Sequence, residues 1–187
     1  CLSAHFKIEN DQIIFGNGSD EIFQLICLAY CEPGDAVISS EHTFSVYKAA
    51  TLSMGASYTS IPMKDFSIDL TGIIDAIDKR TKVIFLANPN NPTGGFIDYY
   101  TLKQFLTQIP PHVLVVIDEA YKEYVSTEPL NDTINFLKSF HNVLITRTYS
   151  KIYGLAGLRI GYGLSTNAIV STLQKVRAPF NVNNLAL

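Results

Sequence analysis

The stretch "KVIFLANPNNPTGG" at residues 82–95 joins an apolar run, typical of a buried β-strand, to a connector rich in asparagine, proline and glycine. A second run, "VLVVI" at residues 113–117, is followed directly by the acidic residues Asp118 and Glu119. Runs of this kind are apolar on both faces, as expected for strands at the centre of a parallel sheet. The two stretches therefore predict a sheet that is covered on both sides.

The remaining sequence alternates apolar runs with helical stretches and turn residues. Strands are predicted at 12–15, 36–39, 56–60, 82–87, 113–118, 143–146 and 158–163, and helices at 20–30, 45–52, 70–78, 99–107, 131–139 and 167–176. This alternation predicts an α/β fold, specifically a three-layer αβα sandwich with a mostly parallel central sheet. A chain of 187 residues is long enough for one such domain, and we expect residues 1–187 to form it.

Composition excludes several classes of protein. The chain is 47% hydrophobic and 17% charged with a net charge of −3, and it has no basic cluster, which argues against a nucleic-acid partner. It has neither an apolar run of about 20 residues nor a signal-peptide pattern, so we expect no membrane association. Cys1, Cys27 and Cys31 have no metal-ligand spacing, so we expect free thiols, no metal site and a cytoplasmic location.

Polar side chains follow three of the predicted strands. Asn91 follows strand 82–87, Asp118 and Tyr121 follow the apolar run 113–117, and Lys151 follows strand 143–146. In parallel sheets, ligands gather at the carboxyl ends of the strands, so we expect these side chains to meet at one edge. Each alone has an ordinary structural explanation, which would be a turn for Asn91, a helix cap for Asp118 and a solvated surface position for Lys151.

The segment "GNGSDEI" at residues 16–22 places glycines before a helix start. The backbone N–H groups of Ser19 and Asp20, with the helix dipole, could hold a phosphate there. The alternative is an ordinary capping turn in which Ser19 or Asp20 is the cap. Glu21 stands where a dinucleotide-binding fingerprint needs its third glycine, and the chain has no "GK[ST]" sequence, so a nucleotide phosphate loop is not indicated.

One ligand class needs all of these groups together, namely a phosphorylated pyridine aldehyde. The aldehyde needs an amine that can be neutral, and desolvation or a nearby positive charge would give Lys151 that property. A protonated pyridine nitrogen needs a carboxylate partner, which Asp118 could supply. A ring hydroxyl needs donors, which Asn91 and Tyr121 could provide.

Two further residues fit the same ligand. Phe44, in "EHTFSVY", could offer an aromatic face to the flat ring. Arg159 could bind the phosphate together with the helix start at Ser19. We expect Arg159 to lie within strand 158–163 and to face away from Leu158 and Ile160. We also expect Lys151 and Arg159 to occupy a mostly buried segment.

In order, the motifs "GNGSDEI", "CEPGD", "HTFSVY", "NPNNPTGG", "VVIDEAYKEY", "TYSKIYGLAGLRIGYG" and "KVRAPFNVNNLA" span essentially the whole chain. This ordered set resembles the fold-type I pyridoxal-phosphate aminotransferases, and within them the histidinol-phosphate aminotransferase branch. The resemblance implies that pyridoxal 5'-phosphate (PLP) is the cofactor and that residues 1–187 are the PLP-binding large domain.

The resemblance also assigns roles to individual residues. It implies that Lys151 attaches the cofactor covalently and then shuttles the substrate proton, and that Asp118 and Tyr121 complete the catalytic group. Cofactor contacts are implied for Ser19, Asp20, Phe44, Asn91, Asp118, Tyr121, Thr148, Ser150, Lys151 and Arg159. Many members of the branch carry tyrosine at the position of Phe44, which puts in doubt a hydroxyl contact to the substrate phosphate.

The implied reaction is transamination of a small amino donor, histidinol phosphate in the first place, with 2-oxoglutarate as acceptor in histidine biosynthesis. The resemblance implies a homodimer and a longer protein, because an amino-terminal arm and a carboxyl-terminal small domain are missing from this chain. Three alternatives remain open. They are an aromatic amino acid aminotransferase, a PLP-binding sensor domain of a transcription regulator, and another PLP reaction such as decarboxylation or β-elimination.

Overall fold

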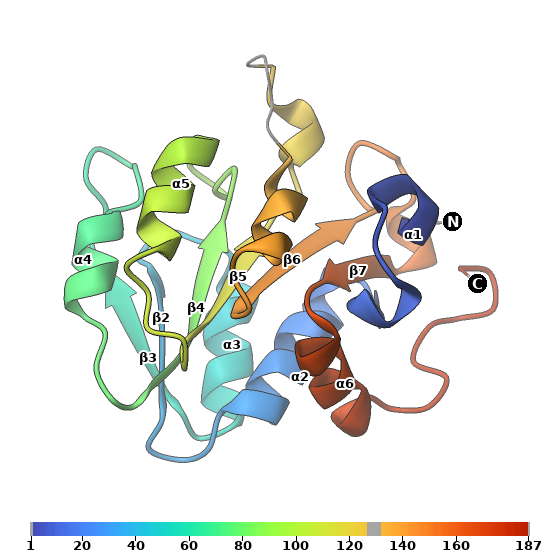
Figure 1. Cartoon of the computed structure of the whole chain (residues 1–187), viewed down its shortest axis with the longest axis horizontal. Coiled ribbons are helices and arrows are strands. Elements are labelled where there is room, and N and C mark those ends of the chain that lie inside the picture. The colour runs from blue at the N-terminus through green and yellow to red at the C-terminus, as the bar shows by residue number, and fades with distance from the viewer. Residues whose placement is uncertain (1, 127–131, 187) are drawn as a thin grey trace.

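The computed structural model describes residues 2–126 and 132–186, and it contains one sheet sandwiched between helices (Figure 1). The strands are β1 (Ile13–Asn17), β2 (Ala36–Ser40), β3 (Ser57–Ile61), β4 (Thr81–Ala87), β5 (Leu114–Asp118), β6 (Val143–Thr148) and β7 (Ile160–Leu164). Their order in the sheet is β1-β7-β6-β5-β4-β2-β3. Strands β3, β2, β4, β5 and β6 pair in parallel, whereas β7 is antiparallel to both β6 and β1. The predicted mostly parallel sheet is confirmed.

Helices cover both faces of this sheet. They are α1 (Leu2–Phe6), α2 (Ser19–Tyr30), α3 (Ser45–Ser53), α4 (Leu70–Asp75), α5 (Tyr99–Leu106) and α6 (Asn167–Val176), with short 3₁₀ helices η1 (Asn10–Gln12), η2 (Lys122–Tyr124), η3 (Thr133–Lys138) and η4 (Ala156–Leu158). Helices α2, α3 and α6 pack on one face, and α1, α4, α5 and η3 pack on the other. This arrangement is the predicted three-layer αβα sandwich.

The central strands bury both of their faces because their side chains alternate between two apolar clusters. In β4, Val83 and Phe85 contribute to the cluster beneath α2 and α3, whereas Ile84 and Leu86 contribute to the cluster beneath α4 and α5. All four side chains are fully buried. A strand that is covered on both sides must be apolar at successive positions, and this is the pattern by which the sequence predicts a covered sheet.

Three predicted elements differ from the structure. The helix expected at 131–139 is the 3₁₀ helix η3, which begins at Thr133. Asp132 caps its amino end by accepting the N–H of Ile134. Asn131 lies outside the described residues. The helix expected at 70–78 ends at Asp75, since Asp78 instead accepts hydrogen bonds from Arg80. The strand expected at 158–163 begins only at Ile160, as described below for Arg159.

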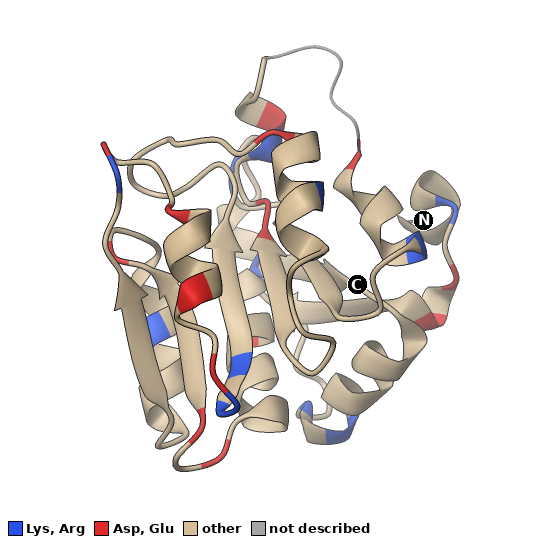
Figure 2. Cartoon of the chain, turned by 60° about the vertical axis from the view of Figure 1, so that its left-hand side comes forward, with Lys and Arg blue, Asp and Glu red and all other residues tan. Residues whose placement is uncertain are grey.

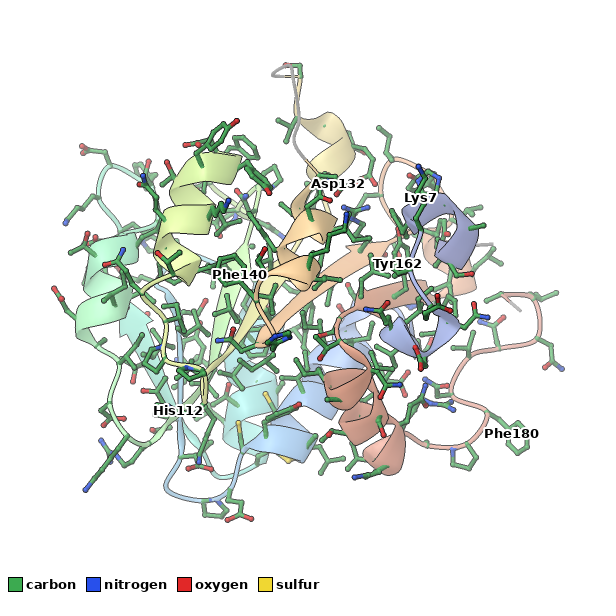
Figure 3. The ribbon with its side chains drawn as sticks, viewed as in Figure 1. Lys7, His112, Asp132, Phe140, Tyr162 and Phe180 are labelled. Carbon is green, nitrogen blue, oxygen red and sulfur yellow. The ribbon has the colours of Figure 1, made fainter. Side chains whose placement is uncertain are left out.

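The segment after α6 returns beside β1. Asn181 donates to the Phe15 carbonyl over 3.1 Å and to Glu21 over 2.7 Å, and the same Glu21 carboxylate accepts the N–H of Asn17 over 2.6 Å. Phe180 is 97% exposed, and its ring extends outward from the body of the molecule (Figure 3). These bonds tie the segment to the first turn of α2, next to the edge at which the polar strand ends meet.

The described surface carries charges of both signs. Lys and Arg are interspersed with Asp and Glu along the ribbon, in keeping with the net charge of −3 (Figure 2). Within residues 2–126 and 132–186, no helix has the length and apolar character needed to cross a membrane, and no group of three or more His, Cys, Asp and Glu side chains could hold a metal. Cys27 and Cys31 are buried and free, as predicted, and Cys1 lies outside the described part of the chain.

Sheet register aligns the ends of neighbouring strands. Ala87 at the end of β4 pairs with Asp118 at the end of β5, and Asp118 pairs with Thr146 of β6. Two residues further along β6, Thr148 pairs with Gly161 of β7, and Gly161 pairs with Gly16 of β1. The carboxyl ends of β1, β4, β5 and β6 and the amino end of β7 therefore open onto the same edge of the sheet.

Candidate active site

A cavity of about 170 Å³ lies at this edge of the sheet. It is lined by Gly18, Ser19, Asp20, Phe44, Ala87, Pro89, Asn91, Asp118, Ala120, Tyr121, Thr148, Ser150, Lys151, Ala156 and Arg159. All ten candidate residues from the sequence are among them. The fold thus brings together side chains that are separated by up to 140 residues along the chain, from Ser19 to Arg159.

Asp118 is the buried acid of the cavity, with 5% of its surface exposed. Its Oδ2 accepts the hydroxyl of Tyr47 over 2.6 Å, and its Oδ1 accepts the hydroxyl of Thr146 over 3.0 Å and the N–H of Ala120 over 3.2 Å. Burial raises the pKa of Asp118 to about 6, although each of these three donors acts to lower it. The carboxylate is therefore fixed in orientation, and its charge is balanced between desolvation and hydrogen bonding.

Lys151 lines the cavity and lies over the ring of Tyr121. Its Nζ is 5.2 Å from the centre of the Tyr121 ring, a distance at which a cation is attracted to the aromatic face. The expectation of a mostly buried segment is wrong for this residue, because β6 ends at Thr148 and the chain from Lys151 to Gly157 runs over the surface. The amine thus reaches the cavity from the solvent side.

The amino end of α2 closes one side of the cavity. Gly18 precedes the helix with φ 74°, and Ser19 and Asp20 form its first turn. The alternative, a side-chain cap by Ser19 or Asp20, is absent, because the capping position belongs to Gly18, which has no side chain. The first N–H groups of a helix have no partner within the helix, so those of Ser19 and Asp20 are available to an anion.

Arg159 differs from its expected position on a strand. It ends η4 in the left-handed region, with φ 51° and ψ 53°, and its carbonyl accepts the N–H of Gly18 over 3.0 Å. This turn, rather than strand alternation, directs its side chain to the cavity. Its Nη2 lies 3.5 Å from Asp20 Oδ2, and its side chain is 44% exposed, so the expectation of burial is wrong here too.

Glycine at position 18 allows this approach. A Cβ added to Gly18 would lie 2.5 Å from Arg159 Nη2, so the guanidinium would have to move away from its place beside the helix start. The positive φ of Gly18 also favours glycine. The guanidinium and the helix start can therefore lie next to each other and present a joint surface for negative charge.

The connectors that carry Phe44 and Asn91 are bonded to each other. Asn90 donates to the carbonyl of His42 over 2.8 Å and accepts the hydroxyl of Thr43 over 2.9 Å. Phe44, which is half-buried, packs edge-to-face against Tyr47 with 5.6 Å between ring centres. These bonds fix the places of Phe44 and Asn91 on the cavity wall.

A buried ionic network supports the segment that carries Tyr121. Arg147 Nε binds Glu119 Oε2 over 2.8 Å, and Arg147 Nη2 binds Asp132 Oδ1 over 2.8 Å. Lys122 Nζ binds the same Asp132 oxygen over 2.6 Å. Lys122 and Arg147 lower the pKa of Asp132 to about 2 against the opposing effect of burial, which is the largest single influence.

Sequence reasoning missed Tyr47, Thr146 and Gly18. Tyr47 could have been found from its position in the first turn of the predicted helix 45–52, three residues after Phe44, since residues at that spacing on a helix are neighbours. Thr146 could have been found from its position two residues before Thr148 on the same strand face. Gly18 is recognisable only once Arg159 is known to lie next to it.

The comparison with known families agrees with this arrangement. The sequence model described as aminotransferase class I and II matches residues 2–187. The chain belongs to this family. Because the match covers almost the whole chain, the sheet, the cavity and the connectors just described all lie within the matched residues.

Similar proteins place the chain more narrowly within the aminotransferases. It is 49% identical to histidinol-phosphate aminotransferase 2 of Pseudomonas fluorescens (strain Pf-5) and 44% identical to histidinol-phosphate aminotransferase of Methylobacillus flagellatus. Each alignment covers 100% of this chain and 50% of the relative. The chain therefore spans about half the length of the curated relatives that it matches.

A solved structure supports the same placement. Histidinol-phosphate aminotransferase of Sinorhizobium meliloti, crystallised in complex with pyridoxal-5'-phosphate, superimposes with a TM-score of 0.93 at 31% identity. The superposition covers 99% of this chain and 50% of that one. The αβα sandwich described above is thus the fold of one half of that aminotransferase chain.

Proposed function

We propose that the cavity at the strand ends binds PLP and that residues 1–187 are the cofactor-binding large domain of a PLP-dependent aminotransferase. The observation that carries this proposal is the convergence of all ten candidate residues on one cavity. The donor set fits the cofactor group by group. A buried acid suits a protonated ring nitrogen, an amine suits an aldehyde, and a helix start beside a guanidinium suits a phosphate.

Each part of the cofactor has a place in this proposal. Asp118 would pair with the ring nitrogen, and Asn91 and Tyr121 would hold the ring hydroxyl. Phe44 would stack on the ring. The phosphate would be held by the N–H groups and the hydroxyl in the first turn of α2, by one hydroxyl at the end of β6 and one just after it, and by one guanidinium. These groups belong to Ser19, Asp20, Thr148, Ser150 and Arg159.

PLP, when bound, supplies an electrophilic carbon for the amino group and a ring that accepts electrons from the substrate. The protein supplies the proton transfers. Lys151 Nζ would take the proton from the carbon that bears the donor's amino group. It would then deliver a proton to the carbon that has received the amino group. Asp118 would keep the ring nitrogen protonated through its buried carboxylate. Tyr121 would hold the Lys151 amine at the cavity, since Lys151 Nζ lies 5.2 Å from the centre of the Tyr121 ring.

The proposed reaction is transfer of the amino group of histidinol phosphate to 2-oxoglutarate. Support comes from the curated relatives of that name, at 44–49% identity over the whole chain. A protein of about twice this length is proposed because each relative is about twice as long as this chain. The homodimeric state, the role in histidine biosynthesis and the cytoplasmic location are proposed from the family resemblance. A membrane or a nucleic acid is not part of the proposal.

Glutamate formation tests this function. The purified protein is incubated with PLP, 2-oxoglutarate and either histidinol phosphate or phenylalanine, and glutamate is measured. We expect glutamate with histidinol phosphate. If phenylalanine also yields glutamate, the kcat/KM should be higher for histidinol phosphate. A preference for phenylalanine would assign the protein to aromatic amino acids. PLP binding without glutamate from any donor would favour a sensor domain or a different PLP reaction.

A further inference from the structure

Tyr47 is a buried tyrosine whose hydroxyl points at the catalytic carboxyl. It lies on α3 with no exposed surface, and its hydroxyl donates to Asp118 Oδ2 over 2.6 Å. Its ring stacks on Phe85 with 4.7 Å between centres and meets Phe23 edge-on at 5.0 Å. The ring is therefore fixed from two sides, so the hydroxyl has a single position available to it.

The bonds to Asp118 are divided between its two oxygens. Thr146 and Ala120 donate to Oδ1, and the hydroxyl of Tyr47 donates to Oδ2. A carboxylate oxygen can accept two hydrogen bonds, so Oδ2 retains an acceptor site while Tyr47 is bound. Asp118 lines the cavity, and the fixed hydroxyl determines the rotation of its carboxyl group.

We propose that Tyr47 is a positioning residue that holds Asp118 as an oriented carboxylate for the ring nitrogen of the cofactor. This inference rests on the proposed function, because it concerns the same cavity and the same cofactor. Tyr47 does not line the cavity. It acts through Asp118, so its effect should be visible in the charge of Asp118 and in cofactor affinity.

The charged and titratable groups around this pair set the direction of the effect. Burial and the nearby Asp20 of α2 raise the pKa of Asp118, whereas the bond from Tyr47 lowers it. Burial, Asp118, Tyr58 of β3 and Asp20 all raise the pKa of Tyr47, so it stays a protonated donor. The cations of Lys151 and Arg159 also line the cavity. Loss of the Tyr47 hydroxyl should therefore raise the pKa of Asp118 above about 6.

The substitution Tyr47→Phe removes the hydroxyl and keeps the ring in its stack. In the cofactor-free protein, carbon-13 labelled aspartate followed by NMR reports the titration of Asp118, and Asp118→Asn assigns the signal. We expect the midpoint to rise by about one pH unit in Tyr47→Phe, the size expected for a hydrogen bond to a charged group. Tyr162→Phe is the matched control, because it removes another tyrosine hydroxyl from a side chain that is 4% exposed.

Cofactor binding provides the second measurement. At about neutral pH, Tyr47→Phe should lower PLP affinity about tenfold, and it should have no further effect when Asp118 is already Asn. Circular dichroism and a urea midpoint verify that the variant is folded. If the wild type binds PLP normally and the Asp118 midpoint is unchanged in Tyr47→Phe, the inference about Tyr47 is wrong, whereas the proposed function stands. Failure of the wild type to bind PLP would overturn the proposed function and this inference with it.

Discussion

Gly161 of β7 lies against the first residue of α2, Ser19, so closely that a Cβ added at Gly161 would stand 2.3 Å from the Ser19 backbone nitrogen. The same Cβ would lie 2.6 Å from the carbonyl carbon of Gly18. Both contacts are to backbone, which cannot rotate away as the end of a side chain could. The position of the helix start, and with it the proposed phosphate site, therefore depends on glycine at position 161.

Gly161→Ala should displace the helix start and weaken PLP binding by tenfold or more, with a loss of about 1–3 kcal/mol in unfolding free energy from overpacking. Gly157→Ala is the matched control, since an added Cβ there has no atom within 4 Å. Fluorescence titration with PLP and urea unfolding measure the two effects. Equal PLP affinity in the two variants would show that the close approach at Gly161 has no bearing on the cofactor.

Arg159→Ala should weaken PLP binding about 10- to 100-fold, because a guanidinium that meets a phosphate makes charge-assisted hydrogen bonds. The fold should be unaffected, since the Arg159 side chain is 44% exposed. Arg80→Ala is the control, as Arg80 is a surface cation paired with Asp78. PLP affinity is measured by titration at constant ionic strength. Wild-type affinity in Arg159→Ala would remove Arg159 from the phosphate site.

The sheet was predictable because its signal is local. The runs at 83–87 and 113–117 are apolar at every position, and strands buried on both faces need this whatever their neighbours are. The convergence of Asn91, Asp118 and Lys151 was predictable because parallel strands deliver their ends to one edge. The ten candidate residues needed the additional resemblance to a family, which supplied Thr148 and Ser150.

The parts that sequence could not supply depend on tertiary contacts. Arg159 reaches the cavity through a left-handed turn that is fixed by a bond from Gly18, which lies about 140 positions earlier, and alternation along a strand cannot anticipate such a turn. The bond from Tyr47 to Asp118 joins a helix to a strand 71 positions away. The exposure of Lys151 follows from where β6 ends, and element boundaries are the weakest part of any sequence-based prediction.

Asp118→Asn should stabilise the cofactor-free protein at about pH 7.5. The pKa of Asp118 is raised from 3.8 to about 6, so the folded protein holds an extra proton between these values and the ionised form costs stability above about pH 6. Asparagine cannot ionise, and we expect a gain of about 1–2 kcal/mol at pH 7.5 that disappears near pH 4. Urea unfolding at both pH values measures this. A variant less stable than wild type at pH 7.5 would contradict the balance inferred for Asp118.

The same substitution should leave PLP bound but remove most turnover. Asparagine fills the space of the carboxyl group, but it cannot stabilise a proton on the ring nitrogen through charge. Glutamate formation at saturating donor and PLP tests this. Turnover close to that of the wild type would mean that Asp118 has no part in the chemistry.

Arg147→Met should lower the unfolding free energy by about 3 kcal/mol, because it leaves the buried Glu119 carboxylate without its main partner. Lys64→Met is the contrasting control, since the Lys64 side chain in its pair with Asp69 is 72% exposed and the pair lies at the surface. Urea unfolding compares the two variants. Equal midpoints would show that the network behind Tyr121 contributes no more than a surface ion pair.

Covalent labelling of Lys151 tests the central claim most directly. The purified protein is incubated with PLP, reduced with borohydride, digested and analysed by mass spectrometry, with Lys151→Ala in parallel. The account predicts one labelled peptide, attached at Lys151 Nζ, and neither label nor the associated visible absorption in Lys151→Ala. A label on another lysine, or equal labelling of Lys151→Ala, would contradict the assignment of the cavity to PLP.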